Sequence, residues 1–296
     1  MTSEITLFVN PTAGRGRGAH AAQPAASAFR DAGFRVRTIV GADAGDALRR
    51  VRQAVAQGTD ALVAVGGDGL TALALRAVAG TSTPLGVVAV GSGNDFGRSL
   101  GLPVRAPAEA ARIVAHALEE RRYRELDLGL IGERWYGTVL ATGFDSRVND
   151  RGNRMRLPLG RFRYDLAILA ELAAFAPVRY RMRLDDGPVQ EVDATLIAVG
   201  NSTSYGGGMR ICAEARLDDG LFDITVVGPC SRTTLLKVFP RVYRGTHLGH
   251  PVVTTHRAAR VELDAPGLTG YADGEPLGPL PLTARCVPAA VRLLAP

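Results

Sequence analysis

Lysine is almost absent from this sequence. Of the 35 basic residues only Lys237 is a lysine, and all the others are arginines. A GxxxxGK[ST] phosphate loop requires a lysine beside its glycines, so that class of nucleotide site is excluded. The shortage also removes most lysine-based covalent catalysis.

Cysteines and long apolar runs are scarce as well. Cys212, Cys230 and Cys286 show no CxxC spacing, so we expect ordinary reduced thiols. No run of 18 or more apolar residues occurs, and the longest candidate, residues 166–178, is too short and contains Glu171. The first ten residues lack the basic start and apolar core of a signal peptide. The sequence therefore predicts a cytoplasmic protein without a transmembrane helix.

Aromatic residues make up only 6% of the chain, and no nucleic-acid-binding module is recognisable, so no nucleic acid partner is expected. The apolar fraction of 46% is enough for sizeable cores, and the charged fraction of 22% argues against disorder. The net charge of +6 suits an anionic membrane surface, nucleic acid or phosphorylated ligands, and by itself it selects none of them.

Strand-like and helix-like segments alternate at the start of the chain. Apolar runs predict strands at residues 5–10, 34–40, 61–67 and 84–91. Helices are predicted at residues 46–58, 70–80 and 107–122, and from about residue 18 to 32 with an interruption at Pro24. This alternation predicts an α/β fold with a doubly wound parallel sheet. Ligands of such sheets bind at the carboxyl ends of the strands, where the loops at Asn10, Gly66 and Gly91 fall.

The pattern changes after Asp127, where strand-like pieces dominate. They read RWYGTVLATG, RYRMRLDDG, VDATLIAVGN, LFDITVVG, AARVELDAP and PLTARCV. Helices are expected at about residues 158–175 and 232–239, and DDG sequences indicate turns. We therefore predict an α/β nucleotide-binding domain at residues 1–125 and a mostly antiparallel, β-rich domain at residues 126–296. The last residues are expected to pack back on the first domain.

Three glycine-rich loops carry the candidate chemistry of the first domain. NPTAGRGRG, residues 10–18, allows close approach to an anion that Arg15 and Arg17 would bind, although a flexible connection explains it equally well. GGDG, residues 66–69, presents Asp68, which would repel a phosphate unless a divalent cation lay between them. A plain DG turn is the alternative. In GSGND, residues 91–95, Ser92 can donate to a phosphate, while Asn94 and Asp95 either bind a ligand or cap a helix.

These loops occur in order with two longer motifs, YGGGMRICAEARLDDGLFD and YADGEPLGPLPL. Together the motifs resemble the diacylglycerol kinase catalytic-domain family, in particular the soluble bacterial lipid kinases, which are similar to sphingosine and ceramide kinases. The resemblance covers almost the whole chain. GGDG alone is also typical of NAD kinases and phosphofructokinases, and the two C-terminal motifs favour a lipid kinase.

The resemblance implies that ATP, with Mg²⁺, binds between the two domains. The nucleotide-binding residues that it implies, together with those of the loops above, are Asn10, Gly66, Gly67, Asp68, Gly69, Thr71, Gly91, Ser92, Gly93, Asn94 and Asp95. In the DGE motif, Glu275 is the implied catalytic carboxylate, with Asp273 beside it and Asp68 organising metal and phosphate. RLDDGL resembles a structural magnesium loop with Asp219 and the carbonyls of Arg216 and Leu221 as ligands, and Asp127 matches a further acid at the domain junction.

The chemistry of Glu275 is coherent without the resemblance, because phosphoryl transfer needs a group that takes the proton of the attacking hydroxyl. A hairpin turn at Asp273–Gly274 is the alternative explanation of DGE. For RLDDG the alternative is a plain turn with a solvated Asp219.

Four positions depart from the family pattern. Leu70 stands where the family has a threonine, with Thr71 one position later, and Ala72 and Leu73 replace an asparagine and a glutamate. Gly41 replaces a threonine near the nucleotide. Loss of one hydrogen bond to a charged group costs roughly 1.5–3 kcal/mol, so weaker nucleotide binding or a slower reaction is expected.

Two further segments have candidate functions. Residues 147–164 contain six arginines and precede an apolar stretch at residues 166–175, which suits an anionic membrane surface as well as it suits a solvated face. His247 and His250 have no third ligand nearby, so zinc is not expected.

The sequence thus predicts an ATP- and Mg²⁺-dependent lipid kinase of phospholipid metabolism, with a diacylglycerol-like substrate at a membrane surface, transient peripheral association and a possible homodimer. The first alternative is a nucleotide-binding regulator of the same fold with weak or lost activity, based on Leu70, Ala72 and Gly41. The second is a kinase for a soluble polyol or dinucleotide. The lipid itself is not identified by the sequence.

Overall fold

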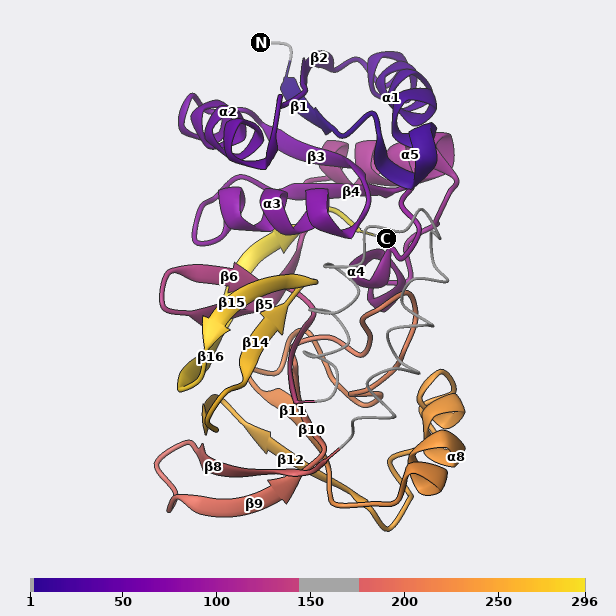
Figure 1. Ribbon diagram of the computed structural model, residues 1–296. Coiled ribbons are helices and arrows are strands. Elements are labelled where there is room, and N and C mark those ends of the chain that lie inside the picture. The colour runs from indigo at the N-terminus through magenta and orange to yellow at the C-terminus, as the bar shows by residue number, and fades with distance from the viewer. Residues whose placement is uncertain (1–2, 144–175, 296) are drawn as a thin grey trace.

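A computed structural model describes residues 3–143 and 176–295 of the chain (Figure 1). The arginine-rich segment 147–164 and the expected helix at 158–175 lie outside these residues. Among the described residues, no helix is both long and apolar enough to span a bilayer.

The first lobe contains a parallel sheet built from four strands. Its strands and helices are β1 Glu4–Val9, α1 Ala13–Asp31, β2 Arg35–Ile39, α2 Ala44–Ala56, β3 Ala61–Gly66, α3 Asp68–Val78, β4 Leu85–Ala89, α4 Asp95–Ser99 and α5 Pro107–Glu119. The strand order is β2-β1-β3-β4, and all neighbours are parallel. Every residue of β3 and β4 is buried, as expected of strands that are covered on both faces.

Helices cover both faces of this parallel sheet. The cores show which helix covers which face, because Leu73 of α3 and Val51 of α2 share one core with Leu62. Phe29 of α1 and Val114 of α5 share the other core with Val63. The alternating direction of neighbouring side chains in β3 thus separates the two layers. The predicted doubly wound α/β arrangement is confirmed.

The prediction that Pro24 interrupts the first helix was wrong. Pro24 lies inside α1, and the non-helical residues are Gly14, Arg15 and Gly16, all with positive φ. Glycine populates this region at little cost, so the chain turns at the glycine-rich loop, one turn before the helix proper begins.

The second lobe contains antiparallel strands in two layers. Its elements are β5 Arg124–Ile131, β6 Arg134–Tyr136, β7 Val139–Gly143, β8 Val178–Leu184, β9 Gln190–Ala194, β10 Leu196–Gly200, β11 Phe222–Val227, α8 Arg232–Val242, β12 Val253–Ala258, β13 Arg260–Asp264, β14 Thr269–Ala272, β15 Glu275–Pro279 and β16 Leu282–Leu293. One sheet has the order β12-β11-β10-β7-β14-β15. The other layer continues the parallel sheet through β16, β13, β8 and β9, with β5 and β6 paired beside it.

Two of the predicted strands are each divided between the layers. RWYGTVLATG forms β6 and β7, and VDATLIAVGN forms β9 and β10, with each pair split between the two sheets. The changes of sheet occur at residues 137–138 and at Thr195. The space between the layers is filled by a core that includes Tyr180, Ile197, Phe222 and Val261.

Strand β16 joins the lobes. It pairs with β13 and β5 in the second lobe, and Leu293 pairs in parallel with Leu85 of β4. Leu293 and Leu294 are fully buried in the two cores of the first lobe. The C-terminal residues therefore belong to the packing of the first lobe.

Candidate active site

The three glycine-rich loops lie together at the carboxyl ends of β1, β3 and β4. A Cβ placed on Gly67 would lie 3.1 Å from the Cα of Gly91, and a Cβ on Gly93 would lie 2.5 Å from Asp68 Oδ2. The glycines are needed here mainly because two loops of the protein pass each other. Gly69 is exposed, and a Cβ there would have nothing within 4 Å, so this position faces open space.

Asp68 connects the second loop to the third. Its carboxylate accepts hydrogen bonds from the backbone N–H groups of Asn94 (2.7 Å) and Asp95 (2.6 Å). The carboxylate thereby caps the start of α4, where unpaired N–H groups attract negative charge. Asp68 is itself in the first turn of α3, which begins two residues earlier than the sequence predicted.

Asp95 is a buried acid of the site with a raised pKa. It is 5% exposed, and its Oδ2 accepts from the N–H of Gly207 at 2.7 Å, in the YGGGMR segment of the second lobe. Burial raises its pKa to about 6; the Gly207 and Gly208 N–H groups and Arg98 oppose this rise, and the neighbouring charge of Asp68 adds to it. Among the described residues its other oxygen, Oδ1, is buried without a hydrogen-bond partner.

This pair of acids fits a divalent cation. A buried carboxylate oxygen without a partner is costly, and the repulsion between Asp68 and Asp95 adds to the cost. A cation such as Mg²⁺, which prefers oxygen ligands, would relieve both. Asp95 would therefore hold it through Oδ1, and Asp68, whose two oxygens each accept a backbone N–H group, would lie beside it.

Three arginines surround the loop at residues 91–93. Arg17 donates to the carbonyl of Gly91 (3.2 Å), Arg105 to that of Ser92 (3.3 Å) and Arg98 to that of Gly93 (2.9 Å). Each guanidinium has five N–H donors, so each keeps several for an anionic ligand. Ser92 is exposed at the tip of the loop. Of these arginines the sequence had indicated only Arg17, because Arg98 and Arg105 are brought to the loop by the fold.

Other predicted nucleotide-binding residues have internal partners. Asn10 Oδ1 accepts from the N–H and the hydroxyl of Thr12. Asn94 is buried, and its Nδ2 donates to the carbonyl of Gly91. Thr71 is 4% exposed, and its hydroxyl donates to the carbonyl of Gly67. Their contact with a nucleotide stays a prediction, and the geometry does not favour it for Thr71.

The departures at Leu70 and Gly41 have structural explanations. Leu70 is 6% exposed and packs against Gly66 within the core of the first lobe. A Cβ on Gly41 would lie 2.4 Å from the Cβ of Ala47 in the first turn of α2. Local packing explains both Leu70 and Gly41. Neither residue indicates that the ligand site has been lost.

Glu275 lies where α3 of the first lobe meets β6 and β15 of the second. Its Oε2 accepts from Arg76 at 2.8 Å and from Arg134 at 3.1 Å. Arg76 is on α3, eight residues after Asp68, or about 12 Å along the helix. Among the described residues, Oε1 of Glu275 has no hydrogen-bond partner and remains available to a substrate. The sequence did not indicate either arginine.

The carboxylate of Asp273 is hydrogen-bonded to the backbone of the second lobe. Its carboxylate accepts from the N–H groups of Gly137 (3.0 Å) and Thr138 (2.9 Å) and from the Thr138 hydroxyl (2.5 Å). Burial raises its pKa, and the three donors oppose the rise. Asp273 therefore fixes the turn from which Glu275 projects, and a direct catalytic part stays a prediction.

The expected structural magnesium loop does not fit a resident cation. Asp219 Oδ1 accepts from the N–H of Leu221, and its Oδ2 is bound by the guanidinium of Arg257. Asp127 is 4% exposed, and both its oxygens accept backbone N–H groups, from Gly220 (2.6 Å) and Ala289 (2.9 Å). The described residues contain no cluster of three metal-ligating side chains. Hydrogen bonds and an arginine thus stabilise this loop.

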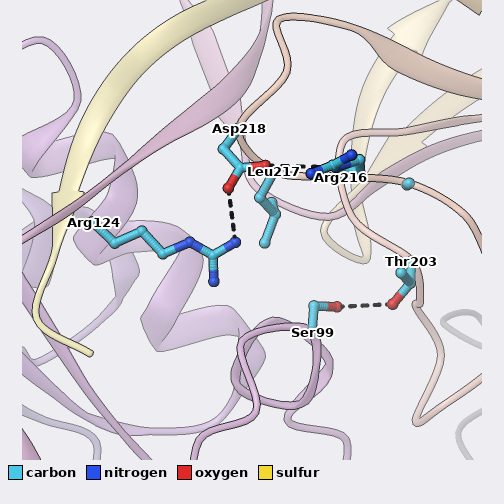
Figure 2. A pocket seen from close by; sticks show the side chains of 7 residues that line it. Ser99, Arg124, Thr203, Arg216, Leu217 and Asp218 are labelled. Carbon is cyan, nitrogen blue, oxygen red and sulfur yellow. Dashed lines mark hydrogen bonds and ion pairs between the residues drawn. The ribbon is translucent and has the colours of Figure 1, made fainter. Parts of the chain in front are cut away.

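A small pocket of about 180 Å³ lies beside this loop. Figure 2 shows Arg124 and Arg216 on either side of Asp218, and Ser99 facing Thr203 across the junction of the lobes. Pockets for small molecules typically measure roughly 300–1,000 Å³, so this one is too small for a nucleotide.

His247 is fully buried, and its Nε2 lies 2.9 Å from the carbonyl of Ile211. Burial lowers its pKa. Asn201, which the sequence did not indicate, is also fully buried and donates to the carbonyls of Asp127 and Gly137. Both side chains have partners typical of structural residues.

Comparisons with known proteins agree with this architecture. Solved structures with the same fold include a diacylglycerol kinase from Bacillus anthracis (20% identity, TM-score 0.75, 99% of this chain and 97% of that chain). An NAD kinase from Archaeoglobus fulgidus, solved in complex with ATP, is more distant (11% identity, TM-score 0.56, 99% and 93%). The two lobes and the site at their junction thus define a protein of the diacylglycerol kinase and NAD kinase fold class.

Sequence comparison identifies the family. The model of the diacylglycerol kinase catalytic domain matches residues 4–131, and that of the YegS C-terminal NAD kinase beta sandwich-like domain matches residues 138–295. A "Diacylglycerol kinase" of Mycobacterium tuberculosis is 45% identical over 99% of this chain and 95% of its own. A "Probable lipid kinase YegS-like" of Xanthomonas euvesicatoria is 32% identical over 85% and 84%. The chain belongs to the diacylglycerol kinase and YegS-like lipid kinase family, as its motifs predicted.

Proposed function

We propose that this protein transfers the γ-phosphoryl group of ATP to the hydroxyl group of a diacylglycerol-like lipid, with Mg²⁺. The observation that carries the proposal is the set of arginines 17, 98 and 105 on three successive carbonyls of residues 91–93. Guanidinium groups suit phosphate oxygens, and phosphoryl transfer depends mainly on positioning and charge neutralisation. The lipid acceptor follows from the names of the relatives.

The residues of the site have separate parts in this reaction. Mg²⁺ held by Asp95, beside Asp68, would neutralise phosphate charge. Glu275 takes the proton of the acceptor hydroxyl at Oε1, since Oε2 is bound by the two arginines. The acceptor oxygen bonds to the γ-phosphorus, the bond from that phosphorus to the β–γ bridging oxygen breaks, and ADP leaves.

The geometry supports a kinase over the nucleotide-binding regulator. Lost activity was inferred only from Leu70, Ala72 and Gly41, and packing explains the first and the last of these residues. Because a diacyl lipid is not free in water, we also propose that the protein acts as a peripheral enzyme at a membrane surface.

The first test measures transfer of labelled phosphate from ATP to a total lipid extract in mixed micelles with Mg²⁺. Glu275→Gln should lower the rate about 10²–10⁴-fold, because the neutral amide cannot accept the proton. Glu133→Gln, an exposed exchange of the same kind in the β5–β6 turn, should leave it unchanged.

The other outcomes separate the alternatives. ATP binding without labelled lipid in any variant would favour the regulator. Stimulation by a soluble polyol or dinucleotide, with none by lipid, would favour the third candidate.

A further inference from the structure

Helix α8, Arg232–Val242, carries two sets of apolar side chains, and one set is buried in the fold. Leu235, Val238 and Val242 are 5%, 2% and 6% exposed and pack on the outer face of the antiparallel sheet. Leu236, Phe239 and Tyr243 repeat the same i, i+3, i+7 spacing one position later. This second set is here called the outer stripe. Because the first set is buried against the sheet, the outer stripe lies on another side of the helix.

The outer stripe is unusual for this molecule. Leu236 is 53% and Tyr243 50% exposed, and they are the two most exposed large apolar side chains of the described residues. The rings of Phe239 and Tyr243 contact each other edge to face at 6.1 Å, so the stripe forms one continuous apolar strip. Figure 1 shows α8 at the outside of the second lobe.

The charge around the stripe has one sign. Arg232, Lys237, Arg241 and Arg244 are all exposed on or next to α8, and they include the only lysine of the chain. Residues 224–261 contain no aspartate or glutamate. Lys237 and Arg241 are four residues apart and form one basic row on the exposed side of the helix. This stretch of chain therefore combines apolar and basic side chains and supplies no acid of its own.

We propose that α8 docks this protein on an anionic lipid bilayer, lying in the plane of the interface. The inference rests on the proposed function, because it explains how an enzyme acting on lipid reaches it. The outer stripe would enter the boundary between headgroups and acyl chains, and the four basic residues would contact anionic headgroups. With 11 residues and a length of about 16 Å, the helix lies on the membrane and cannot span it.

The experiment compares sedimentation of the full chain with two kinds of vesicle. One is pure phosphatidylcholine, and the other is phosphatidylcholine with phosphatidylglycerol. The wild type should bind the anionic vesicles more tightly, and added salt should weaken this binding. Leu236→Ser with Tyr243→Ser should weaken it about tenfold or more, because apolar area is lost from the interface.

A second variant tests vesicle binding through the basic side chains, in case the first variant unfolds. Lys237→Gln with Arg241→Gln changes only exposed side chains and should weaken binding to anionic vesicles about 25-fold, roughly fivefold for each charge. Matched controls on other faces are Val189→Ser, an exposed apolar residue, and Arg30→Gln with Arg52→Gln, an exposed basic pair. The controls should bind like the wild type.

Activity on a short-chain lipid dispersed as monomers separates the two proposals. If both α8 variants keep full transfer to this lipid and lose vesicle binding, both proposals stand. If the wild type binds vesicles through α8 and phosphorylates no lipid, the docking surface stands and the proposed function fails. Vesicle binding that no α8 variant weakens overturns the docking surface. A dimer in ultracentrifugation that Leu236→Ser with Tyr243→Ser dissociates, with vesicle binding unchanged, assigns the stripe to a second copy of this chain.

Discussion

At the scale of single residues, Asp95 carries a charge that the fold makes costly. Its pKa is raised to about 6 in the native state, against 3.8 for an ordinary aspartate, because the carboxylate is buried. Between these two values the native state binds more protons than the unfolded state, so stability falls as the pH rises. The cost is largest above pH 6, where the carboxylate is ionised in both states.

Asp95→Asn should remove this pH dependence. Without nucleotide and divalent cation, the wild type should lose about 2 kcal/mol of unfolding free energy relative to the variant between pH 4.5 and 7.5. Urea denaturation at several pH values measures the difference. A difference in unfolding free energy that stays constant across this pH range would show that the pKa of Asp95 is not raised.

Arg76 is predicted to be a positioning residue for Glu275. Its side chain is 11% exposed, and its partner is 199 residues away in the sequence. Arg76→Gln should lower kcat about 10–100-fold with little change in the KM for ATP, because Arg76 lies about 12 Å along α3 from Asp68. Arg76→Lys should recover part of kcat.

Arg134→Gln is the matched comparison for Arg76→Gln in the measurement of kcat. Arg134 is 42% exposed, and its pair with Glu275 is longer and more solvated, so the loss of kcat should be smaller. A raised KM for ATP with normal kcat in Arg76→Gln would place Arg76 in nucleotide binding.

At the scale of elements, Asp127 joins three segments that are distant in sequence. From β5 it accepts hydrogen bonds from the DDG turn and from the bulge of β16. Asp127→Ala would leave two N–H groups without an acceptor, at about 1–3 kcal/mol each. We expect a loss of about 3–5 kcal/mol in urea denaturation.

Asp218→Ala is the control for that prediction. Asp218 is 38% exposed and pairs with Arg124 at the surface, so its loss should cost less than about 1 kcal/mol. Equal losses in the two variants would refute the joining role of Asp127.

The start of α3 determines where the carboxylate of Asp68 lies. GGDG reads as a loop, and the structure places Asp68 inside the first helical turn, directed at the N–H groups of α4. The carboxylate is thus fixed in place before any ligand binds. This preorganisation is what an electrostatic site needs.

At the scale of the whole molecule, β16 makes the two lobes interdependent. Leu293 is fully buried in the first lobe although its strand begins in the second. Leu293→Ala should lower the unfolding free energy by about 2–5 kcal/mol, because it leaves a cavity in the shared sheet. Leu236→Ala, at a 53% exposed position, should change it by less than about 0.5 kcal/mol. Thermal unfolding of both variants tests the contrast.

Much of the architecture was predictable because it depends on local patterns. The period of apolar residues predicted the strands and helices of the first lobe, and turn residues marked their ends. The glycine loops fell at the ends of strands by chain order alone, and the order of five motifs identified the family. Homodimerisation and the domain boundary near residue 125 stay predictions.

The sequence by itself determined the doubly wound sheet, the loops at its edge and the acids they carry. Only the tertiary structure decided which side chains those acids meet. The three arginines on residues 91–93 come from three separate segments, and Glu275 meets Arg76 across 199 residues. The division of two strands between sheets is equally non-local. Periodicity records which face of an element is buried, whereas contacts between distant segments depend on how the elements pack, and no short stretch of sequence encodes that.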